Sequence, residues 1–221
     1  MLNKEKRKAV LKKDERWLQN WTNRLLAYLF VRFLEKTRIQ PNHLTLLSFI
    51  LAVLSVFLII PDTQTLRIIA SICLFCSLVF DSADGQLARL KNKTSKLGYW
   101  LDKITDRLKE SLLIIAITYV VYNRSLEYKL WYLGVGVIFL INFMYYNLEL
   151  LKKTFYLRET GFPQNNLIIR NLLSFGYGER IIYFSILLLF NQLVFILWLV
   201  IIGCTFHILV NTYTAIKKRE A

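Results

Sequence analysis

Four carboxylates occupy two short stretches of this sequence, each beside a long run of apolar residues. Asp81 and Asp84 are three positions apart, and Asp102 and Asp106 are four positions apart. At either spacing two side chains project from the same face of a helix, so two helices can direct four carboxylates toward one point. Hard divalent cations such as Mg²⁺ and Mn²⁺ take oxygen ligands of this kind and are commonly held together with substrate phosphates. The spacing therefore predicts a metal site for a phosphorylated substrate.

The elements that position these acids are expected to be membrane-spanning helices. The chain has 221 residues, 55% of them hydrophobic, and its mean hydropathy is +0.40, which is typical of an integral membrane protein. We expect an all-α polytopic fold of six transmembrane helices. The fifth is short in its apolar core and needs its polar lead-in or its neighbours to complete the crossing. The six spans, each near the length that a bilayer requires, are 43–61, 66–90, 108–123, 129–147, 180–191 and 193–214.

The positions of Lys and Arg predict the orientation of these spans. Of the 29 in the chain, only Arg67, Arg124 and Lys129 fall outside the segments and loops expected on one side. The positive-inside rule then places both termini and the acids at the cytoplasmic face of a cytoplasmic or equivalent inner membrane. The net charge of +14 fits contact with anionic membrane lipids, and no nucleic-acid partner is expected. The lysines expected to face water or lipid are Lys91, Lys93 and Lys96.

Residues 1–40 are expected to form an N-terminal amphipathic segment that lies in the membrane interface. Because its charged stretch is long and no small-residue cleavage pattern follows a short apolar core, the segment does not resemble a cleavable signal peptide. Pro41 suits the start of a helix, so a six-helix transmembrane domain is expected over 41–221. The apolar residues that recur at helical spacing in the first segment are Trp17, Trp21, Leu25, Leu26, Leu29, Phe33 and Leu34.

The four acids belong to a longer pattern of fixed residues. This pattern resembles, position for position, the signature of the CDP-alcohol phosphotransferase (CDP-alcohol phosphatidyltransferase) family. The segment Pro41-Asn42-x2-Thr45 also resembles the lead-in to that family's first span, and the resemblance covers about residues 40–215. Written out, the pattern is Asp81-x2-Asp84-Gly85-x2-Ala88-Arg89-x8-Gly98-x3-Asp102-x3-Asp106.

The resemblance implies a reaction and the residues that perform it. An alcohol hydroxyl attacks the phosphate of a CDP-linked donor, CMP leaves and a phosphodiester forms. Asp81, Asp84 and Asp102 match the family's ligands for Mg²⁺ or Mn²⁺, and Asp106 matches both a ligand and the general base. These residue types suit the chemistry, because attack on a pyrophosphate adds negative charge and depends on positioning and cationic stabilisation.

Six further residues are candidates for binding the nucleotide. Gly85 and Ala88 lie on the acidic face of their helix, where small residues let a nucleotide approach; tight packing of two helices is the alternative. Arg89 can reach a phosphate or the cytidine, and its alternative is an anchor on the positive side. Helix capping accounts equally well for Asn42 and Ser95. The six candidates are Asn42, Thr45, Gly85, Ala88, Arg89 and Ser95.

The acceptor alcohol is expected to meet cationic residues on the cytoplasmic side. Arg158 and Arg180 are the candidates, and Arg180 stands where a helix enters the membrane, so its guanidinium can clamp an anionic acceptor such as inositol phosphate or glycerol phosphate. Pairing of Arg180 with Glu179, or contact with lipid headgroups, is the alternative. The donor is open among CDP-diacylglycerol, an archaeal CDP-dialkylglycerol and a soluble CDP-inositol.

The sequence also bears on two other classes of protein, transporters and membrane scaffolds, and on the oligomeric state. A transporter keeps intramembrane acids near the bilayer midplane, often between repeats, and no repeat relates the halves of this sequence. A membrane scaffold gives no reason for four converging acids. The resemblance also implies a homodimer. The third and fourth spans, with Gly134 and Gly136, are candidate contact surfaces for it, and lipid contact is the alternative.

Overall fold

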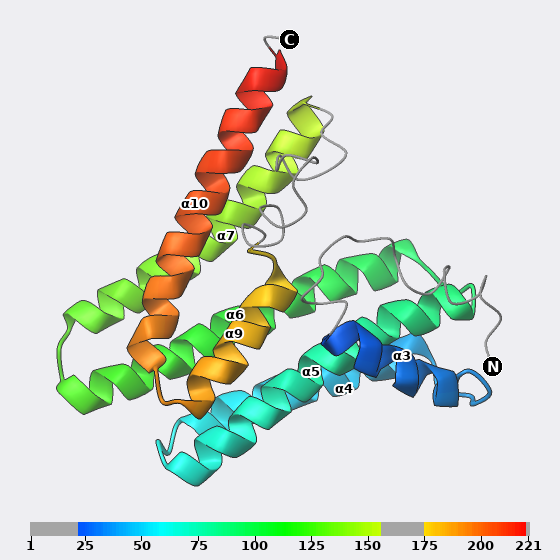
Figure 1. Cartoon of the computed structure of the whole chain (residues 1–221), viewed down its shortest axis with the longest axis horizontal. Helices are drawn as coiled ribbons and strands as arrows, with labels where there is room; N and C mark the ends of the chain where they lie inside the picture. The colour runs from blue at the N-terminus through cyan, green and yellow to red at the C-terminus, as the bar shows by residue number, and fades with distance from the viewer. Residues whose placement is uncertain (1–21, 156–174, 220–221) are drawn as a thin grey trace.

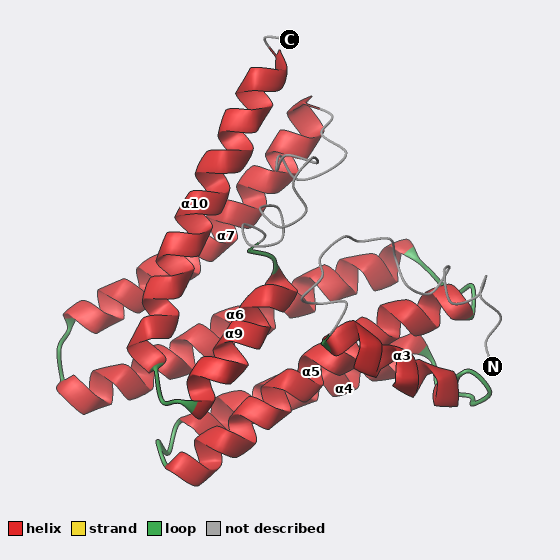
Figure 2. Cartoon of the chain, viewed as in Figure 1, coloured by secondary structure: helices red, strands yellow, loops and turns green. Residues whose placement is uncertain are grey.

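The computed structural model describes residues 22–155 and 175–219, and every regular element within these ranges is an α-helix (Figure 1, Figure 2). The all-α prediction is therefore confirmed for the described residues. Three residues named from the sequence, Trp17, Trp21 and Arg158, lie outside them. In chain order the helices are α3 (Asn23–Leu34), α4 (Pro41–Ile59), α5 (Gln64–Leu90), α6 (Lys96–Ser125), α7 (Lys129–Phe155), α9 (Tyr177–Leu189) and α10 (Leu193–Arg219).

Helices α4 and α5 pack closely through small and hydroxyl-bearing residues. The Ser55 hydroxyl donates to the Ala70 carbonyl oxygen at 2.8 Å, and the Ser77 hydroxyl donates to the Ser48 carbonyl oxygen at 2.7 Å. Small side chains let two helix backbones approach, and the hydrogen bonds satisfy hydroxyl groups that have no access to water. The pair therefore forms a tight platform on which the polar side chains of both helices lie near each other.

Helix α3 lies against α5 and presents an apolar face away from it. Asn23, Ala27 and Val31 recur every four residues and are buried, and the Asn23 side chain donates to the Ser82 hydroxyl at 2.5 Å. On the opposite side Phe33 is 78% exposed. A helix with one face on the protein and an exposed apolar face suits a membrane interface, in agreement with the amphipathic pattern of the sequence.

Helix α6 connects the α4–α5 platform to α7, which runs side by side with α10 toward the C-terminus (Figure 1). Gly134 lies where α7 meets α6, because a Cβ atom there would overlap the Thr118 side chain. The expectation that Gly134 serves contact between two copies is therefore corrected: it serves packing within one chain. At Gly136 no side chain of another described helix lies within 4 Å of the position its Cβ would take, so it lies on an open face of α7.

Four described helices are long and apolar enough to cross a membrane: α4, α5, α7 over Lys129–Thr154 and α10 over Leu193–Lys217. The predicted spans 108–123 and 180–191 fall in α6 and α9. The apolar half of α6 also carries Lys109, Glu110 and Arg124, and the 13 residues of α9 extend only about 20 Å, less than a hydrocarbon core of about 30 Å. The described part of the chain thus shows four candidate crossings.

Three turns are joined by polar contacts at the helix ends that are remote from the four acids. We refer to the contacts that centre on Asp62 as the anchor. Arg124, at the end of α6, donates to Asp62 in the turn between α4 and α5 at 2.7 and 2.5 Å, and to the Asn191 side chain in the turn after α9 at 2.6 Å. Arg67 also donates to the Asp62 carboxylate at 2.6 Å. Hydrogen bonding from Arg124 lowers the pKa of the Asp62 carboxyl below its ordinary value. The anchor fixes the relative positions of the helix pairs that carry the acids.

We predict that Asp62→Asn destabilises the protein by about 1 kcal/mol at neutral pH, or about 2–4 °C in Tm. Asp62 has a φ of 55°, which asparagine also adopts, so the substitution removes the charge and keeps the turn. Because the folded-state pKa is lowered, the stabilisation is present above the unfolded-state pKa of about 4 and is lost as the pH falls through the folded value. Thermal unfolding in detergent between pH 3 and 7 measures this. Glu127→Gln is the matched control, and an equal loss there, or no loss in Asp62→Asn, contradicts the prediction.

Candidate active site

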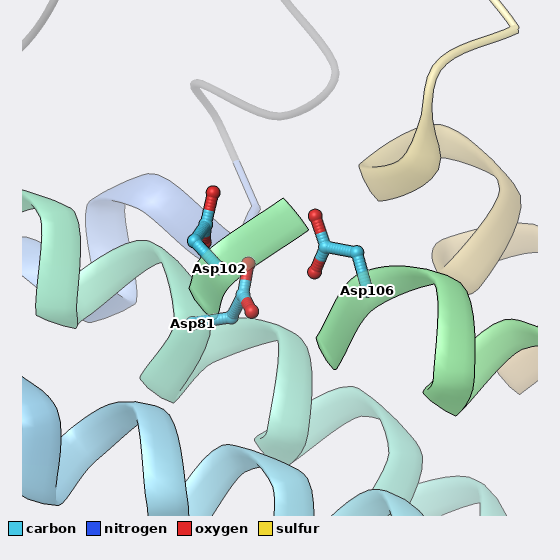
Figure 3. A group of neighbouring side chains, drawn as sticks. All are labelled: Asp81, Asp102 and Asp106. Atoms are coloured by element: carbon cyan, nitrogen blue, oxygen red, sulfur yellow. The ribbon is translucent and has the colours of Figure 1, made fainter. Parts of the chain in front are cut away.

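Three of the four predicted carboxylates converge between α5 and α6. Asp81 of α5 and Asp102 and Asp106 of α6 each offer an oxygen that lies within 4.8 Å of the others. Figure 3 shows the three side chains directed toward one another from the two helices. Asp102 and Asp106 are one turn apart, so helical periodicity places both on the face of α6 that meets α5. We refer to Asp81, Asp102 and Asp106 as the acidic cluster.

Asp84 lies one turn beyond Asp81 and is held by α4. It is 6% exposed, and its Oδ2 accepts a hydrogen bond of 2.5 Å from the Thr45 hydroxyl. Thr45 is buried as well, and it also lies 3.3 Å from the Pro41 carbonyl oxygen. A buried carboxylate needs such donors, because loss of water is otherwise uncompensated. The Thr45 hydroxyl, which the sequence predicted to contact a nucleotide, therefore already donates to Asp84.

The start of α6 is set by Ser95 and Gly98. Ser95 is the N-cap of the helix, and its hydroxyl accepts a hydrogen bond of 2.9 Å from the backbone N–H of Gly98. A Cβ atom at Gly98 would lie 3.1 Å from that hydroxyl oxygen, so the glycine leaves room for the cap. The capping role that the sequence allowed for Ser95 is observed. It fixes where α6 begins, and hence the height at which Asp102 and Asp106 project.

The Lys91 side chain corrects one expectation from the sequence. It was expected to face water or lipid, but its ammonium donates at 2.8 Å to the carbonyl oxygens of both Thr37 and Ile39. These carbonyls belong to the segment between α3 and α4. The physical reason for the difference is that the chain turns back beside the end of α5, and free carbonyl groups there need donors.

Two lysines of α6 contact the acidic cluster, and the sequence analysis did not identify them. The Lys103 ammonium lies 2.9 Å from Asp102 and 3.7 Å from Asp106, and its side chain is 44% exposed. The Lys109 ammonium lies 2.6 Å from Asp81 and 3.4 Å from Asp106, and its side chain is 1% exposed. The available signal was the spacing, since each lysine is three positions from Asp106 and shares its helix surface.

Arg180, at the start of α9, is completely buried and pairs with Glu110 of α6. Its guanidinium also donates to the Tyr145 hydroxyl and, at 2.5 Å, to the Phe175 carbonyl oxygen. Both alternatives weighed from the sequence, Glu179 and lipid headgroups, are corrected: the charged partner is Glu110. The pairing depends on contact between helices that are far apart in sequence, so spacing alone does not predict it.

The Arg180 network also includes Arg107, through the ring of Tyr145. Arg107 directly follows Asp106, and its guanidinium carbon lies 2.8 Å from the centre of the Tyr145 ring. Its Nη1 atom is buried and has no hydrogen-bond partner among the described residues. Arg107 was not predicted as a site residue, although its position next to Asp106 was a usable signal. Side chains of α6, α7 and α9 thus form one connected set, which begins on α6 at the residue next to Asp106.

The remaining candidates for nucleotide binding lie on accessible surface near the acids. Gly85, Ala88 and Arg89 are partly exposed, and among the described side chains a Cβ atom at Gly85 would contact the Arg89 guanidinium, at 3.5 Å. Asn42 is exposed at the start of α4. At that helix start the Gln40 backbone N–H donates to the His43 ring at 3.3 Å, so the capping of α4 does not use the Asn42 side chain.

The sequence model of the CDP-alcohol phosphatidyltransferase family matches residues 38–205, a range that includes the acidic cluster and Asp84. The chain belongs to this family. It is 35% identical over 36% of its length to archaetidylinositol phosphate synthase of Pyrococcus horikoshii. It is 31% identical over 41% of its length to the bifunctional IPC transferase and DIPP synthase of Thermococcus kodakarensis. The matched segments cover 40% and 20% of these two relatives, less than half of each.

The acidic cluster of this chain has the donor set for a hard divalent cation. Asp106 Oδ1 is buried and accepts no hydrogen bond from the described residues, and its nearest cation is the Lys109 ammonium at 3.4 Å. The other donors are carboxylate oxygens as well, and oxygen ligands suit Mg²⁺ or Mn²⁺. Asp81, Asp102 and Asp106 would hold the ion, and Asp84 stands beside them.

We predict that Thr45→Val and Thr118→Val, two identical substitutions of buried threonines, have different effects. Thr45 donates to Asp84, so its replacement leaves a buried carboxylate without its donor and lowers stability by about 1–3 kcal/mol. The buried Thr118 hydroxyl has no hydrogen-bond partner among the described residues, so valine there is neutral or stabilising. Thermal unfolding of the two variants in one detergent checks this, and equal Tm values would show that the bond to Asp84 contributes nothing.

Proposed function

We propose that this chain transfers a substituted phosphate group from a CDP-linked donor to the hydroxyl of an acceptor alcohol and releases CMP. The observation that carries the proposal is the convergence of Asp81, Asp102 and Asp106 inside the segment that matches the family. The product is a phosphodiester of phospholipid or polar-lipid biosynthesis. Membership of the family supports the reaction class, and the geometry supports the residues proposed for it.

The residues of the two acidic helices would bind and orient the donor. Mg²⁺ or Mn²⁺, when bound, supplies positive charge that offsets the negative charge of the pyrophosphate. Arg89 contacts a donor phosphate or the cytidine, and the open α5 surface at Gly85 and Ala88 admits the nucleotide. Thr45 keeps Asp84 oriented, and any contact that it makes with the nucleotide comes in addition.

Asp106 is proposed as the general base for the attacking hydroxyl. Its Oδ1 accepts no hydrogen bond from the part of the chain that the structure describes and lies within the cluster, so it can take the proton as the acceptor oxygen bonds to phosphorus and the bond to CMP breaks. The α6 backbone fixes its position relative to Asp102. The exposed side chains of Asn42 and Ser95 complete the proposed nucleotide contacts.

The acceptor is proposed to be a phosphorylated polyol, with inositol phosphate ahead of glycerol phosphate. One relative is named for archaetidylinositol phosphate, which supports a phosphorylated inositol product in that protein. Arg158 stays a proposed contact to the acceptor. Because Arg180 is buried and bound to Glu110, we place it in the support of the acceptor site, where it orients Tyr145. Whether the CDP-linked donor is a lipid or a soluble molecule is determined by the assay of CMP release described below.

We propose six membrane crossings, with α6 and α9 completing their crossings against neighbouring helices, and an interfacial segment over 1–40 before a transmembrane domain over 41–221. Both termini and the acidic cluster face the cytoplasm in this arrangement. The support is the distribution of Lys and Arg, together with the anchor at Asp62, which holds Arg67 and Arg124 at the ends of α5 and α6 remote from the cluster.

A homodimer is proposed through the open face of α7. Val135, Phe139 and Phe143 are 62%, 67% and 43% exposed along that helix, and Gly136 lies on an open surface between them. Crosslinking in native membranes, followed by mass determination after mild extraction, is expected to give a species of twice the chain mass. A monomer under both conditions would refute the dimer.

The test of the reaction is CMP release from a panel of CDP-linked donors and polyol acceptors, with Mg²⁺, with Mn²⁺ and with chelator. We expect release only with a divalent cation and a fall of about a hundredfold or more in Asp102→Asn. Glu127→Gln makes the same acid-to-amide change at an exposed position outside the cluster and is expected to retain activity. The productive pair of substrates then identifies the acceptor and the donor.

The opposite result would reject the proposed site. CMP release that persists in Asp102→Asn would show that the acidic cluster is not catalytic. Absence of turnover with every pair, together with unchanged binding of CDP-linked donor and metal in Asp102→Asn, would favour a membrane scaffold or a transporter with a divalent-cation site.

A further inference from the structure

Lys109 is a buried cation in direct contact with the acidic cluster. Its ammonium donates at 2.6 Å to Asp81 Oδ1 and at 3.1 Å to the Ser48 hydroxyl, and it lies 3.4 Å from Asp106 Oδ1. The Tyr177 ring covers another side, with its centre 5.5 Å away. The ammonium therefore joins α4, α5 and α6 at the inner end of the cluster.

Lys103 provides a comparison on the same helix. It also contacts Asp102 and Asp106, but its side chain is 44% exposed, whereas that of Lys109 is 1% exposed. Rotation about its side-chain bonds can carry the Lys103 ammonium into solvent. Lys109 has no such route, because the surrounding helices enclose it. Only one of the two cations can leave when another cation enters the cluster.

The charge of a lysine in this position has opposite effects on the stability of the metal-free protein and on its affinity for metal. In the protein without metal, its charge offsets the mutual repulsion of Asp81 and Asp106, and loss of one partner from a buried pair is strongly destabilising. In the protein with metal, its charge repels the divalent ion, and this repulsion is large where water is excluded. The same residue thus stabilises the fold and weakens the binding of metal.

We propose that Lys109 is a permanent internal cation of the metal centre, which holds Asp81 and Asp106 together before metal binds and limits the affinity for metal afterwards. The inference rests on the proposed metal-dependent function. Lys109 acts as a positioning residue, through the two carboxylates that it contacts. A bound ion then enters a cluster that is already assembled and can leave it again.

The test compares wild type, Lys109→Met and Lys103→Met as purified full-length chains in detergent. Mn²⁺ binding is measured by electron paramagnetic resonance, and Tm is measured with chelator and with saturating Mn²⁺. For Lys109→Met we expect a Tm about 10 °C lower in chelator, recovery of most of that loss in Mn²⁺, and a Kd for Mn²⁺ about tenfold tighter. Lys103→Met removes the same charge from an exposed position, and we expect a Tm within about 2 °C of wild type and a Kd within about threefold.

The outcomes separate this inference from the metal centre itself. If wild type binds Mn²⁺ but Lys109→Met loses the same stability with and without Mn²⁺, or binds Mn²⁺ no more tightly, Lys109 only joins helices and the inference fails. If Lys109→Met folds only when prepared with Mn²⁺, the inference holds; if neither it nor Lys109→Gln folds with Mn²⁺, the inference fails. A wild-type chain that binds no Mn²⁺ overturns the metal centre and the inference with it.

Discussion

Electrostatic repulsion among Asp81, Asp102 and Asp106, whose oxygens lie within 4.8 Å of one another, is the constraint on which the arrangement of α5 and α6 depends. Charges this close between packed helices persist only when cations or hydrogen-bond donors offset them. Lys109 and Lys103 supply the cations, and Thr45 supplies a donor to the adjacent Asp84. The helices that surround the cluster are therefore held by the same groups that make a cation site possible.

Packing of small residues between α4 and α5 is the second requirement. The contacts of Ser55 with Ala70 and of Ser77 with Ser48 bring two backbones close together, so a side chain as short as threonine reaches an acid on the neighbouring helix. Larger residues along this contact would separate the helices, which would take the donor Thr45 away from Asp84 and the acceptor Ser48 away from Lys109. The chemistry of the cluster thus depends on residues that carry no charge.

Helical periodicity was sufficient to predict the parts of the site that lie within one helix. The spacing of Asp102 and Asp106 predicted their common face, and the fixed pattern predicted the family that the comparisons confirm. Contacts between helices were not predicted in the same way. Glu110 as the partner of Arg180 and Asp81 as the partner of Lys109 depend on how α5, α6 and α9 pack, which no local pattern encodes. The charged residues within α6 and the short length of α9 likewise limited how well hydropathy could predict the membrane crossings.

The anchor at Asp62 has a mechanical consequence for the acids at the other end of the helices. Arg67 and Asp81 are both on α5, separated by about 21 Å at 1.5 Å per residue, while Arg124 and Asp106 are separated by about 27 Å along α6. Helices clamped at one end move as levers, so a tilt of about 3° at the anchor displaces a carboxylate by about 1 Å, a misplacement large enough to matter in a catalytic site. The anchor between three turns at one end of the helices therefore sets the tolerance to which the acidic cluster at the other end can be aligned.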